Sequence, residues 1–288
     1  MKRKKDQFLF NGKDYLISKA NFAVYWDTKG EWGWTDIDLQ QSMDKYYASV
    51  SYDSHKAQKR TVLDWIYFFI QQLMFRYKWK KICAQAQCTL QSHLDFGGGV
   101  GGFSSFTKTK GINPVLIDSN NKALLIAKYQ GIEAYKSLIE LPVNHRFDLI
   151  TLWHVLEHLS SPDETLKALK QRLNENGLLV VAVPNLQSPD AKHYGPHWGA
   201  YDLPRHLWHF STPGLIRLLS EIGFNLLAQH PLYFDAFYVA LLSEKHKTGK
   251  ARLFSAFYQG LRSNFLARKQ GNYSSSFFVF AKSDSFLV

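Results

Sequence analysis

Residues 93–103 read HLDFGGGVGGF, a short apolar run that meets a cluster of glycines. Because glycine has no Cβ, a turn of this composition lets the backbone approach a ligand where a side chain would clash. The turn alone leaves several interpretations open. Gly97, Gly99 and Gly102 also satisfy the G-x-G-x-x-G pattern of dinucleotide sites, and a tight turn without a ligand has the same composition.

Two carboxylates narrow the choice. Asp95 lies two residues before the first glycine, where dinucleotide-binding strands are usually apolar, and Gly101 completes an acidic-x-Gly-x-Gly-x-Gly string. Asp118 ends the next apolar run, 21 residues after Gly97, at the place of a carboxylate that accepts both ribose hydroxyls. A helix N-cap would explain Asp118 alone. The combination predicts a ligand whose ribose lacks a 2′-phosphate.

Around this turn the chain alternates between strand and helix patterns. Apolar runs predict strands at residues 92–96, 114–117, 147–153, 178–183, 224–228 and 274–282. Helices are predicted after a capping box at 161–164 with a stop at 176–177, from 212 to 223, and across most of 234–270. Such alternation is typical of a parallel sheet covered on both faces, so we expect an α/β domain with a late antiparallel strand pair.

The composition fits a folded protein of one large or two modest domains. Of 288 residues, 45% are hydrophobic and 20% charged, which excludes wholesale disorder. The formal charge of +11 comes mostly from residues 1–5, 76–81 and 245–269, which argues against a uniform nucleic-acid groove. Two cysteines are too few for a disulfide framework or a zinc site and fit a reducing, cytoplasmic location. The sequence shows neither a signal-peptide core nor an apolar stretch near the roughly 20 residues of a membrane span.

We expect two regions along the chain. Residues 1–90 form an extension with a small fold, and residues 91–288 form the α/β domain. Near the end of the extension, residues 62–79 place aromatic side chains on one helical stripe with a basic end. Packing on a neighbouring domain is the favoured interpretation of such a stripe, and contact with a membrane surface is the alternative.

Four successive motifs resemble those of class I S-adenosylmethionine-dependent methyltransferases. They are LDFGGGVGGF at 94–103, VLID at 115–118, FDLITLWHVLEHL at 147–159 and GLLVVAVPN at 177–185. The resemblance covers about residues 90–230 and is greatest to the ubiquinone-pathway O-methyltransferases and sugar C-methyltransferases, through the LEH string and a PRHLWHFS segment at 204–211. It implies S-adenosylmethionine as cofactor and a Rossmann-like seven-stranded, mostly parallel sheet with a reversed last strand.

The resemblance also implies which residues hold the cofactor. The glycines would approach it, Asp118 would bind the ribose, and the backbone near His154 would contact the methionine part. The full set carried over is Asp95, Gly97, Gly99, Gly101, Asp118, Ser119, Ser137, Leu138, Trp153 and His154. The chain departs from the family twice. Residues 135–138 (YKSL) lack the acidic residue often found near the adenine amine, and residues 1–60 lack the cysteines of the zinc module that opens many relatives.

Six of the eleven histidines lie between residues 154 and 209, where the acceptor chemistry is expected. A sulfonium is already an activated methyl donor, so a base is needed only when the acceptor must lose a proton, and histidine titrates near neutrality. The candidate catalytic residues are His209, His206, His158 and Tyr201. We prefer His209, because Phe210 and the helix that starts at Thr212 would fix its orientation.

Residues 186–212 show little regular pattern, and we expect them to act as a lid over the acceptor. A folded surface loop with inward-facing aromatics is the alternative. A stretch at 46–55 (YYASVSYDSH) resembles one that precedes this domain in relatives, which suggests a role in closing over the cofactor.

No metal site is expected. His154 and His158, or His193 and His197, have ligand-like spacing but lack a matching carboxylate motif. Glu157 and His158 have two interpretations that explain the sequence equally well. One is a hydrogen-bonded pair that fixes the loop after the strand predicted at 147–153, and the other is a catalytic role.

The leading hypothesis is a methyltransferase that acts on an oxygen or carbon of a small molecule or saccharide. A nucleic-acid methyltransferase is the rival suggested by charge, but residues 153–156 (WHVL) replace the string that holds a flipped base, and both cysteines precede the glycine turn. No specific nucleic-acid partner is therefore expected. A nicotinamide-dependent oxidoreductase and a non-catalytic cofactor-binding module are the remaining alternatives.

Overall fold

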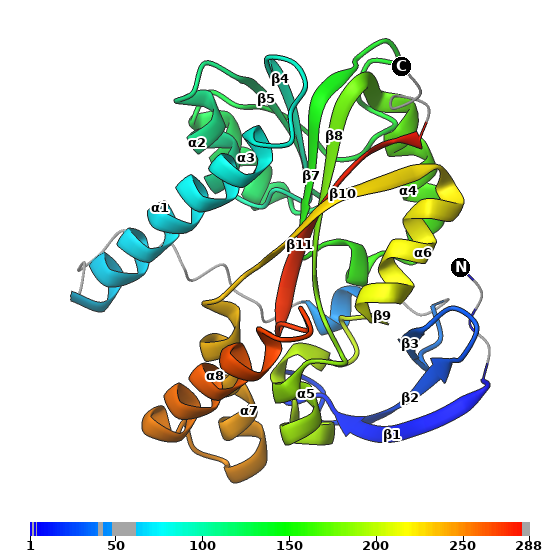
Figure 1. Cartoon of the computed structure of the whole chain (residues 1–288), viewed down its shortest axis with the longest axis vertical. Helices are drawn as coiled ribbons and strands as arrows, with labels where there is room; N and C mark the ends of the chain where they lie inside the picture. The colour runs from blue at the N-terminus through cyan, green and yellow to red at the C-terminus, as the bar shows by residue number, and fades with distance from the viewer. Residues whose placement is uncertain (2, 4, 40–42, 48–61, 284–288) are drawn as a thin grey trace.

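A seven-stranded sheet forms the centre of the molecule (Figure 1). The structure is a computed structural model and describes residues 1, 3, 5–39, 43–47 and 62–283. In spatial order the strands are β10 (Phe224–Pro231), β11 (Ser275–Lys282), β8 (Leu173–Pro184), β7 (Phe147–Trp153), β4 (Ser92–Phe96), β5 (Asn113–Ile117) and β6 (Glu133–Tyr135). β4 to β8 are parallel, and β11 runs antiparallel to both β8 and β10. The expected α/β, Rossmann-like sheet with a reversed last strand is confirmed.

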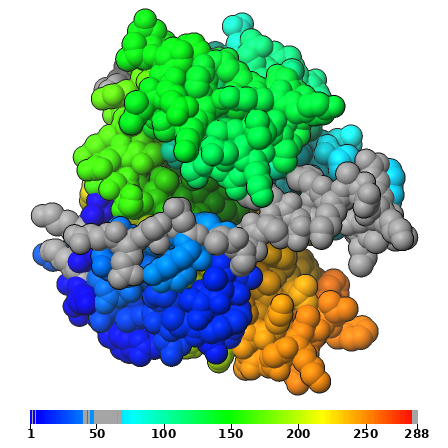
Figure 2. Space-filling model, turned by 180° about the vertical axis from the view of Figure 1, so that it is seen from behind, coloured from blue at the N-terminus to red at the C-terminus, as the bar shows by residue number. Residues whose placement is uncertain are grey.

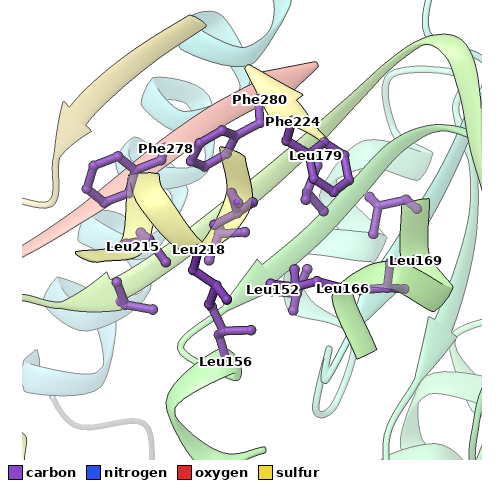
Figure 3. Packing of buried hydrophobic residues seen from close by; sticks show 14 of the residues in the cluster. Leu152, Leu156, Leu166, Leu169, Leu179, Leu215, Leu218, Phe224, Phe278 and Phe280 are labelled. Carbon is purple, nitrogen blue, oxygen red and sulfur yellow. The ribbon is translucent and has the colours of Figure 1, made fainter. Parts of the chain in front are cut away.

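Helices cover both faces of this sheet because its strands alternate apolar side chains between them. Leu166 and Leu169 of α4 (Pro162–Arg172) and Leu218 of α6 (Thr212–Ile222) pack on one face, where Phe278 and Phe280 project from β11 (Figure 3). Phe277 and Val279, which alternate with them along β11, face the other side of the sheet. There they join a cluster with side chains of α1 (Val62–Cys83) and α2 (Gly102–Lys108). α3 (Asn121–Tyr129) packs beside β5 and β6.

Several boundaries differ from those predicted. The capping box at 161–164 does not form, because the Ser161 side chain makes no cap hydrogen bond. α4 ends at Arg172 and β8 begins at once, so Asn176 and Gly177 lie within the strand instead of stopping the helix. The three-residue strand β6 was not predicted, because it is too short to show a periodic pattern.

A second, four-stranded antiparallel sheet joins two distant parts of the chain. Its strands are β1 (Gln7–Lys13), β2 (Asn21–Asp27), β3 (Trp32–Thr35) and β9 (Trp208–Phe210). β9 pairs with β3, which places Gly33 opposite His209. The N-terminal strands lie beneath the α/β body, as the blue and green surfaces in Figure 2 show.

The segment 186–212, expected to be irregular, is folded. It contains α5 (Pro189–Tyr194), 3₁₀ turns at Gly195–His197 and Gly199–Tyr201, and β9. Its aromatic side chains Tyr194, Trp198, Tyr201 and Trp208 are buried. The segment therefore forms a packed wall. The sequence does not predict this, because the turns are too short to show a periodic pattern of apolar residues.

Three further helices project from the body. α1 contains the residues 62–79 predicted as helical, and α7 (Asp235–Thr248) and α8 (Leu253–Ala267) form a pair between β10 and β11 (Figure 1). In the described part of the chain, no helix has both the length and the apolar composition needed to cross a membrane.

Candidate functional site

The glycine turn after β4 adopts a backbone that favours glycine. Gly97, Gly99 and Gly101 have φ values of +72°, +57° and +81°. A Cβ added to Gly97 would lie 2.4 Å from Cγ2 of Val155, so this position has no room for a side chain. The turn is thus shaped to bring the main chain close to whatever lies at the carboxyl ends of β4, β5 and β7.

Asp95 supports the turn from behind. It is 1% exposed, and its two carboxylate oxygens accept hydrogen bonds from the Thr151 hydroxyl at 2.7 Å and the Ser104 hydroxyl at 2.8 Å. These contacts tie β4 to β7 and α2. The expectation that Asp95 contacts the cofactor itself is therefore revised to a positioning role, because the carboxylate is buried behind the turn.

A cavity of about 1770 Å³ opens at the carboxyl ends of the parallel strands. The expected residues that line it are Gly97, Asp118, Ser119, Ser137, Leu138, His154, His158, Tyr201 and His206. Asp95, Gly99, Gly101, Trp153 and His209 lie outside its wall. Ligands of open α/β sheets bind at this end of the strands, so most of the expected residues meet where a nucleoside would bind.

Asp118 is well placed for a ribose. Its carboxylate lines the cavity at the end of β5 and accepts hydrogen bonds from the backbone N–H groups of Gly99 and Asn120, each at 2.8 Å. Ser137 and Leu138, which follow β6, line the same space. Three features therefore fit a nucleoside with free ribose hydroxyls. They are the glycine turn, which has no room for a Cβ, the carboxylate of Asp118, and the neighbouring wall formed by Ser137 and Leu138.

Trp153 faces away from the cavity. Its ring packs edge-on against Phe103 and Phe277, and Lys78 of α1 places its Nζ 3.8 Å from the ring centroid. The Trp153 side chain therefore holds α1 against the sheet, and the contact expected of the backbone here with the methionine part stays a prediction. Burial lowers the pKa of Lys78 to about 8, although Asp235 and Asp95 partly oppose this.

His154 begins the loop after β7 in the left-handed region, with φ +55°, which is uncommon for a side chain other than glycine. Its Nε2 lies 3.0 Å from Oδ2 of Asp235, and its Nδ1 lies 3.4 Å from Oε1 of Glu157. Burial alone would lower the pKa of His154, but the hydrogen bond to Asp235, the ion pair with Glu157 and the charges of both carboxylates outweigh it and raise the pKa to about 10. His154 is thus a cation that links the loop to α7.

Glu157 is the buried partner of this cation. It is 1% exposed, and burial alone would raise its pKa; the contact with His154, with His206 and His158 close by, lowers the pKa to about 2. Its folded-state pKa lies below the ordinary 4.5, so Glu157 stabilises the fold above pH 4.5. That contribution is lost as the pH falls through about 2.

We expect Glu157→Gln to lower the free energy of unfolding by about 2 kcal/mol at pH 7. This is less than the roughly 3 to 5 kcal/mol of a fully buried pair, because His154 keeps Asp235 and is partly exposed. Urea unfolding measures the effect. Since the native carboxylate loses its charge toward pH 2, the difference between the two proteins should shrink between pH 4.5 and pH 2. A difference of equal size at pH 7 and pH 3 would contradict the assigned pair.

Two histidines meet Glu157 from different segments. The rings of His158 and His206 lie 4.5 Å apart in a T-shaped arrangement. Nδ1 of His206 lies 2.8 Å from the carbonyl of Ala200, and Nδ1 of His158 lies 3.0 Å from that of Arg205. Each Nδ1 therefore carries a proton and donates it, which leaves each Nε2 as an acceptor in the neutral ring. Burial, with His206 nearby, lowers the pKa of His158 to about 4.

Glu157, His158 and His206 form a cluster that the sequence could not bring together. One nitrogen or oxygen donor from each lies within 4.8 Å of the others, and within the described ranges this is the group that could hold a metal ion. Neither carboxylate oxygen of Glu157 has a hydrogen-bond partner among the described residues. This group is neither of the pairs His154–His158 and His193–His197, whose spacing along the chain resembles that of metal ligands. The cluster can instead bind a cation, or accept a hydrogen bond from the molecule that is to be methylated.

His209 is not placed to act on an acceptor. It is 4% exposed, its Nε2 lies 2.9 Å from the Thr35 hydroxyl, and it does not line the cavity. Burial lowers the pKa of this imidazole to about 3. The preference for His209 as the base is therefore revised, because pairing of β9 with β3 makes His209 part of the second sheet and places its side chain against Thr35.

Tyr201, which was expected at the site, and Arg205 form part of the cavity wall. Tyr201 lines the cavity and contacts Phe10 and Trp198, and burial raises the pKa of its phenol well above the ordinary value. Arg205 donates two hydrogen bonds to the Asp202 carboxylate, at 3.0 and 2.6 Å, and forms an ion pair with buried Asp14 at 3.4 Å. The N-terminal region is thereby fastened to the segment 186–212.

The sequence gives the stretch that contains Tyr47 a role in closing over the cofactor and gives none to Tyr15, yet both residues line the cavity. Tyr47 lines it, with its hydroxyl 3.2 Å from Nδ1 of His158; the rest of the stretch, residues 48–55, lies outside the described residues. Tyr15 also lines it, with its ring stacked at 4.0 Å on His246 and its hydroxyl 2.7 Å from Nδ1 of His197. Spacing cannot reveal these contacts, because Tyr15 and His246 are joined only by the tertiary fold.

Comparison with known proteins agrees with this geometry. A family model described as a methyltransferase domain matches residues 55–229. Among solved structures, the fold is similar to a protein from Galdieria sulphuraria assigned as a sarcosine dimethylglycine methyltransferase, with a TM-score of 0.53, 16% identity, and coverage of 74% of this chain and 86% of that one. It is also similar to a SAM-dependent methyltransferase from Thermotoga maritima, with a TM-score of 0.51, 16% identity, and coverage of 75% and 92%. No curated protein matches the sequence.

Proposed function

Because the chain belongs to the methyltransferase-domain family, with S-adenosylmethionine as its cofactor, we propose that it methylates an oxygen or carbon of a small molecule or saccharide. One observation carries the proposal. The cavity that contains Gly97 and Asp118 at one end is continuous with the space lined by His158 and His206 at the other. A bound cofactor and an acceptor would therefore share one open cavity.

The protein's part in the reaction is chiefly to position and to exclude water. The bound cofactor supplies an activated methyl group on a sulfonium, so alignment of donor and acceptor lowers the barrier most. Asp118 would hold the ribose, the turn at Gly97 would approach the cofactor through its main chain, and Ser137 and Leu138 would flank the base. Trp198 and Tyr201 close the acceptor side.

A proton must leave when the acceptor is a hydroxyl. His206 is the residue we assign to accept it, because Nδ1 donates to the Ala200 carbonyl and Nε2 is left with a free lone pair. Glu157 would stabilise the imidazolium formed, since its buried carboxylate lacks other hydrogen bonds among the described residues. His158 and Tyr47 complete the polar wall around the acceptor.

Calorimetry with S-adenosylhomocysteine tests the cofactor site without an acceptor. We expect Asp118→Ala to weaken binding by about 1.5 to 3 kcal/mol, the cost of charge-assisted hydrogen bonds to the ribose. Asp118→Asn, which keeps an acceptor oxygen of the same shape, should recover part of the loss. An unchanged dissociation constant in Asp118→Ala would leave Asp118 as a structural cap of the turn.

Thermal stabilisation separates the remaining alternatives. Protection by S-adenosylhomocysteine and none by NAD is expected, and the reverse would point to a nicotinamide-dependent oxidoreductase. A gel-shift assay with salt titration addresses the nucleic-acid rival. Tight, steeply salt-dependent binding of RNA or DNA would revive it. Mass spectrometry of compounds that copurify with the protein would identify the acceptor.

A further inference from the structure

Helix α8 has the reverse of the usual amphipathic arrangement. The side chains that it buries are small, namely Ala256, Gly260, Ser263 and Ala267. Its exposed side chains include seven large apolar ones, and we call this surface the α8 face: Leu253, Phe254, Phe257, Tyr258, Leu261, Phe265 and Leu266. Phe254 is 94% exposed. Exposed apolar patches of this kind mark interaction surfaces in soluble folds.

Specific contacts fix the orientation of α8. A Cβ on Gly260 would lie 2.6 Å from Cδ1 of Phe237, so α7 and α8 pack too closely for any larger residue there. The hydroxyl of Ser263 donates to the carboxylate of Asp190 in α5 at 2.8 Å. The small side therefore has to face inward, and the large apolar side chains are left outside.

The charge around the α8 face has one sign. Residues 245–271 contain seven Lys and Arg side chains and no Asp or Glu. All seven are exposed, two of them in the last turn of α7 and five on α8 or next to its ends: Lys245 and Lys247; Lys250, Arg252, Arg262, Arg268 and Lys269. An apolar stripe flanked by cations is complementary to a lipid interface whose headgroups are anionic.

The apolar surface extends from α8 to α1. Asn264 of α8 donates to the carbonyl of Tyr233 at 3.0 Å, and the ring of Tyr233 lies 6.4 Å from that of Tyr77 in α1. Tyr233 is itself exposed, as are Phe68 and Phe69 further along α1. α1 and the α7–α8 pair project on the same side of the molecule (Figure 1).

We propose that the α8 face binds the surface of a membrane that contains anionic lipid, with the helix lying in the plane of the interface. A second copy of this chain is the less favourable occupant, because two such faces would bring positive charges against positive charges. The membrane instead offers anionic headgroups to the cations and an apolar layer to the phenylalanines.

Sedimentation of the full chain with vesicles tests the proposal. We expect binding to vesicles of phosphatidylcholine with phosphatidylglycerol, and at least about tenfold weaker binding to phosphatidylcholine alone. Phe254→Ser with Phe265→Ser should lower partitioning into the anionic vesicles at least about tenfold. Arg262→Glu with Lys269→Glu should do so most strongly at low salt. The matched control is Leu125→Ser with Tyr129→Ser, which changes two exposed apolar residues of α3 and should bind as the unmodified protein does.

Calorimetry with S-adenosylhomocysteine shows that each variant is folded, because α8 lies outside the cofactor end of the cavity. Failure of the unmodified protein to bind anionic vesicles would overturn the proposal. Equal loss in the α3 control would also overturn it. A dimer seen by light scattering and dissociated by the two Phe→Ser changes would assign the α8 face to a second copy instead.

Discussion

Replacement of His206 by alanine is expected to lower turnover by about 10² to 10⁴-fold when the acceptor is a hydroxyl, the size typical of losing a general base. The reason is geometric. His206 lines the cavity beside Glu157 and His158, and its Nδ1 is committed to the Ala200 carbonyl, so Nε2 is the atom free to take the proton. Transfer of label from methyl-labelled S-adenosylmethionine to the acceptor identified by mass spectrometry measures the rate.

The same assay decides between the two histidines. His209→Ala should retain turnover in the fraction of protein that stays folded, because His209 faces Thr35 and not the cavity. Cofactor affinity should be nearly unchanged in both variants, since neither residue is a hydrogen-bond partner of Asp118 or of the glycine turn. Full turnover in His206→Ala together with its loss in His209→Ala would restore the original expectation.

Substitution of Gly97 by valine is expected to weaken binding of S-adenosylhomocysteine by at least about 100-fold, roughly 2.7 kcal/mol. Two effects combine. The added Cβ would lie 2.4 and 2.8 Å from the two γ carbons of Val155, and a β-branched residue at φ +72° strains the backbone. Because Gly97 lines the cavity, relief of either effect moves the turn that approaches the cofactor.

Gly111 provides the matched control for this change. Its φ is +79°, but nothing lies within 4 Å of the Cβ that would be added. Gly111→Val therefore introduces the backbone strain without the steric conflict. Circular dichroism checks the fold of both variants, and calorimetry measures affinity. An equal loss of affinity in both would attribute the effect to general strain, and unchanged binding in Gly97→Val would remove the turn from the cofactor site.

The glycine turn, Asp118 and His154 could be placed at one edge of the sheet from the sequence, because their positions depend on local features. Each parallel strand is a short apolar run, and its carboxyl end is marked by the glycines after β4, by Asp118 after β5 and by His154 after β7. The ends of neighbouring parallel strands meet at one edge of a sheet. Spacing along the chain therefore fixes both the fold class and the place of these residues, without knowledge of any long-range contact.

The acceptor half was decided only by the tertiary structure. Pairing of β9 with β3 sets Gly33 opposite His209 and takes that histidine out of the cavity, whereas His206 stays beside Glu157. Asp235 reaches His154 across 81 residues, and no local period records such an approach. Burial likewise separates Asp95, which is enclosed, from Asp118, which faces the cavity, although both lie near the carboxyl end of a parallel strand. Spacing along the chain determines which strand ends meet at the edge of the sheet. Whether a side chain there faces the cavity or the protein interior depends on the distant segments that pack against it.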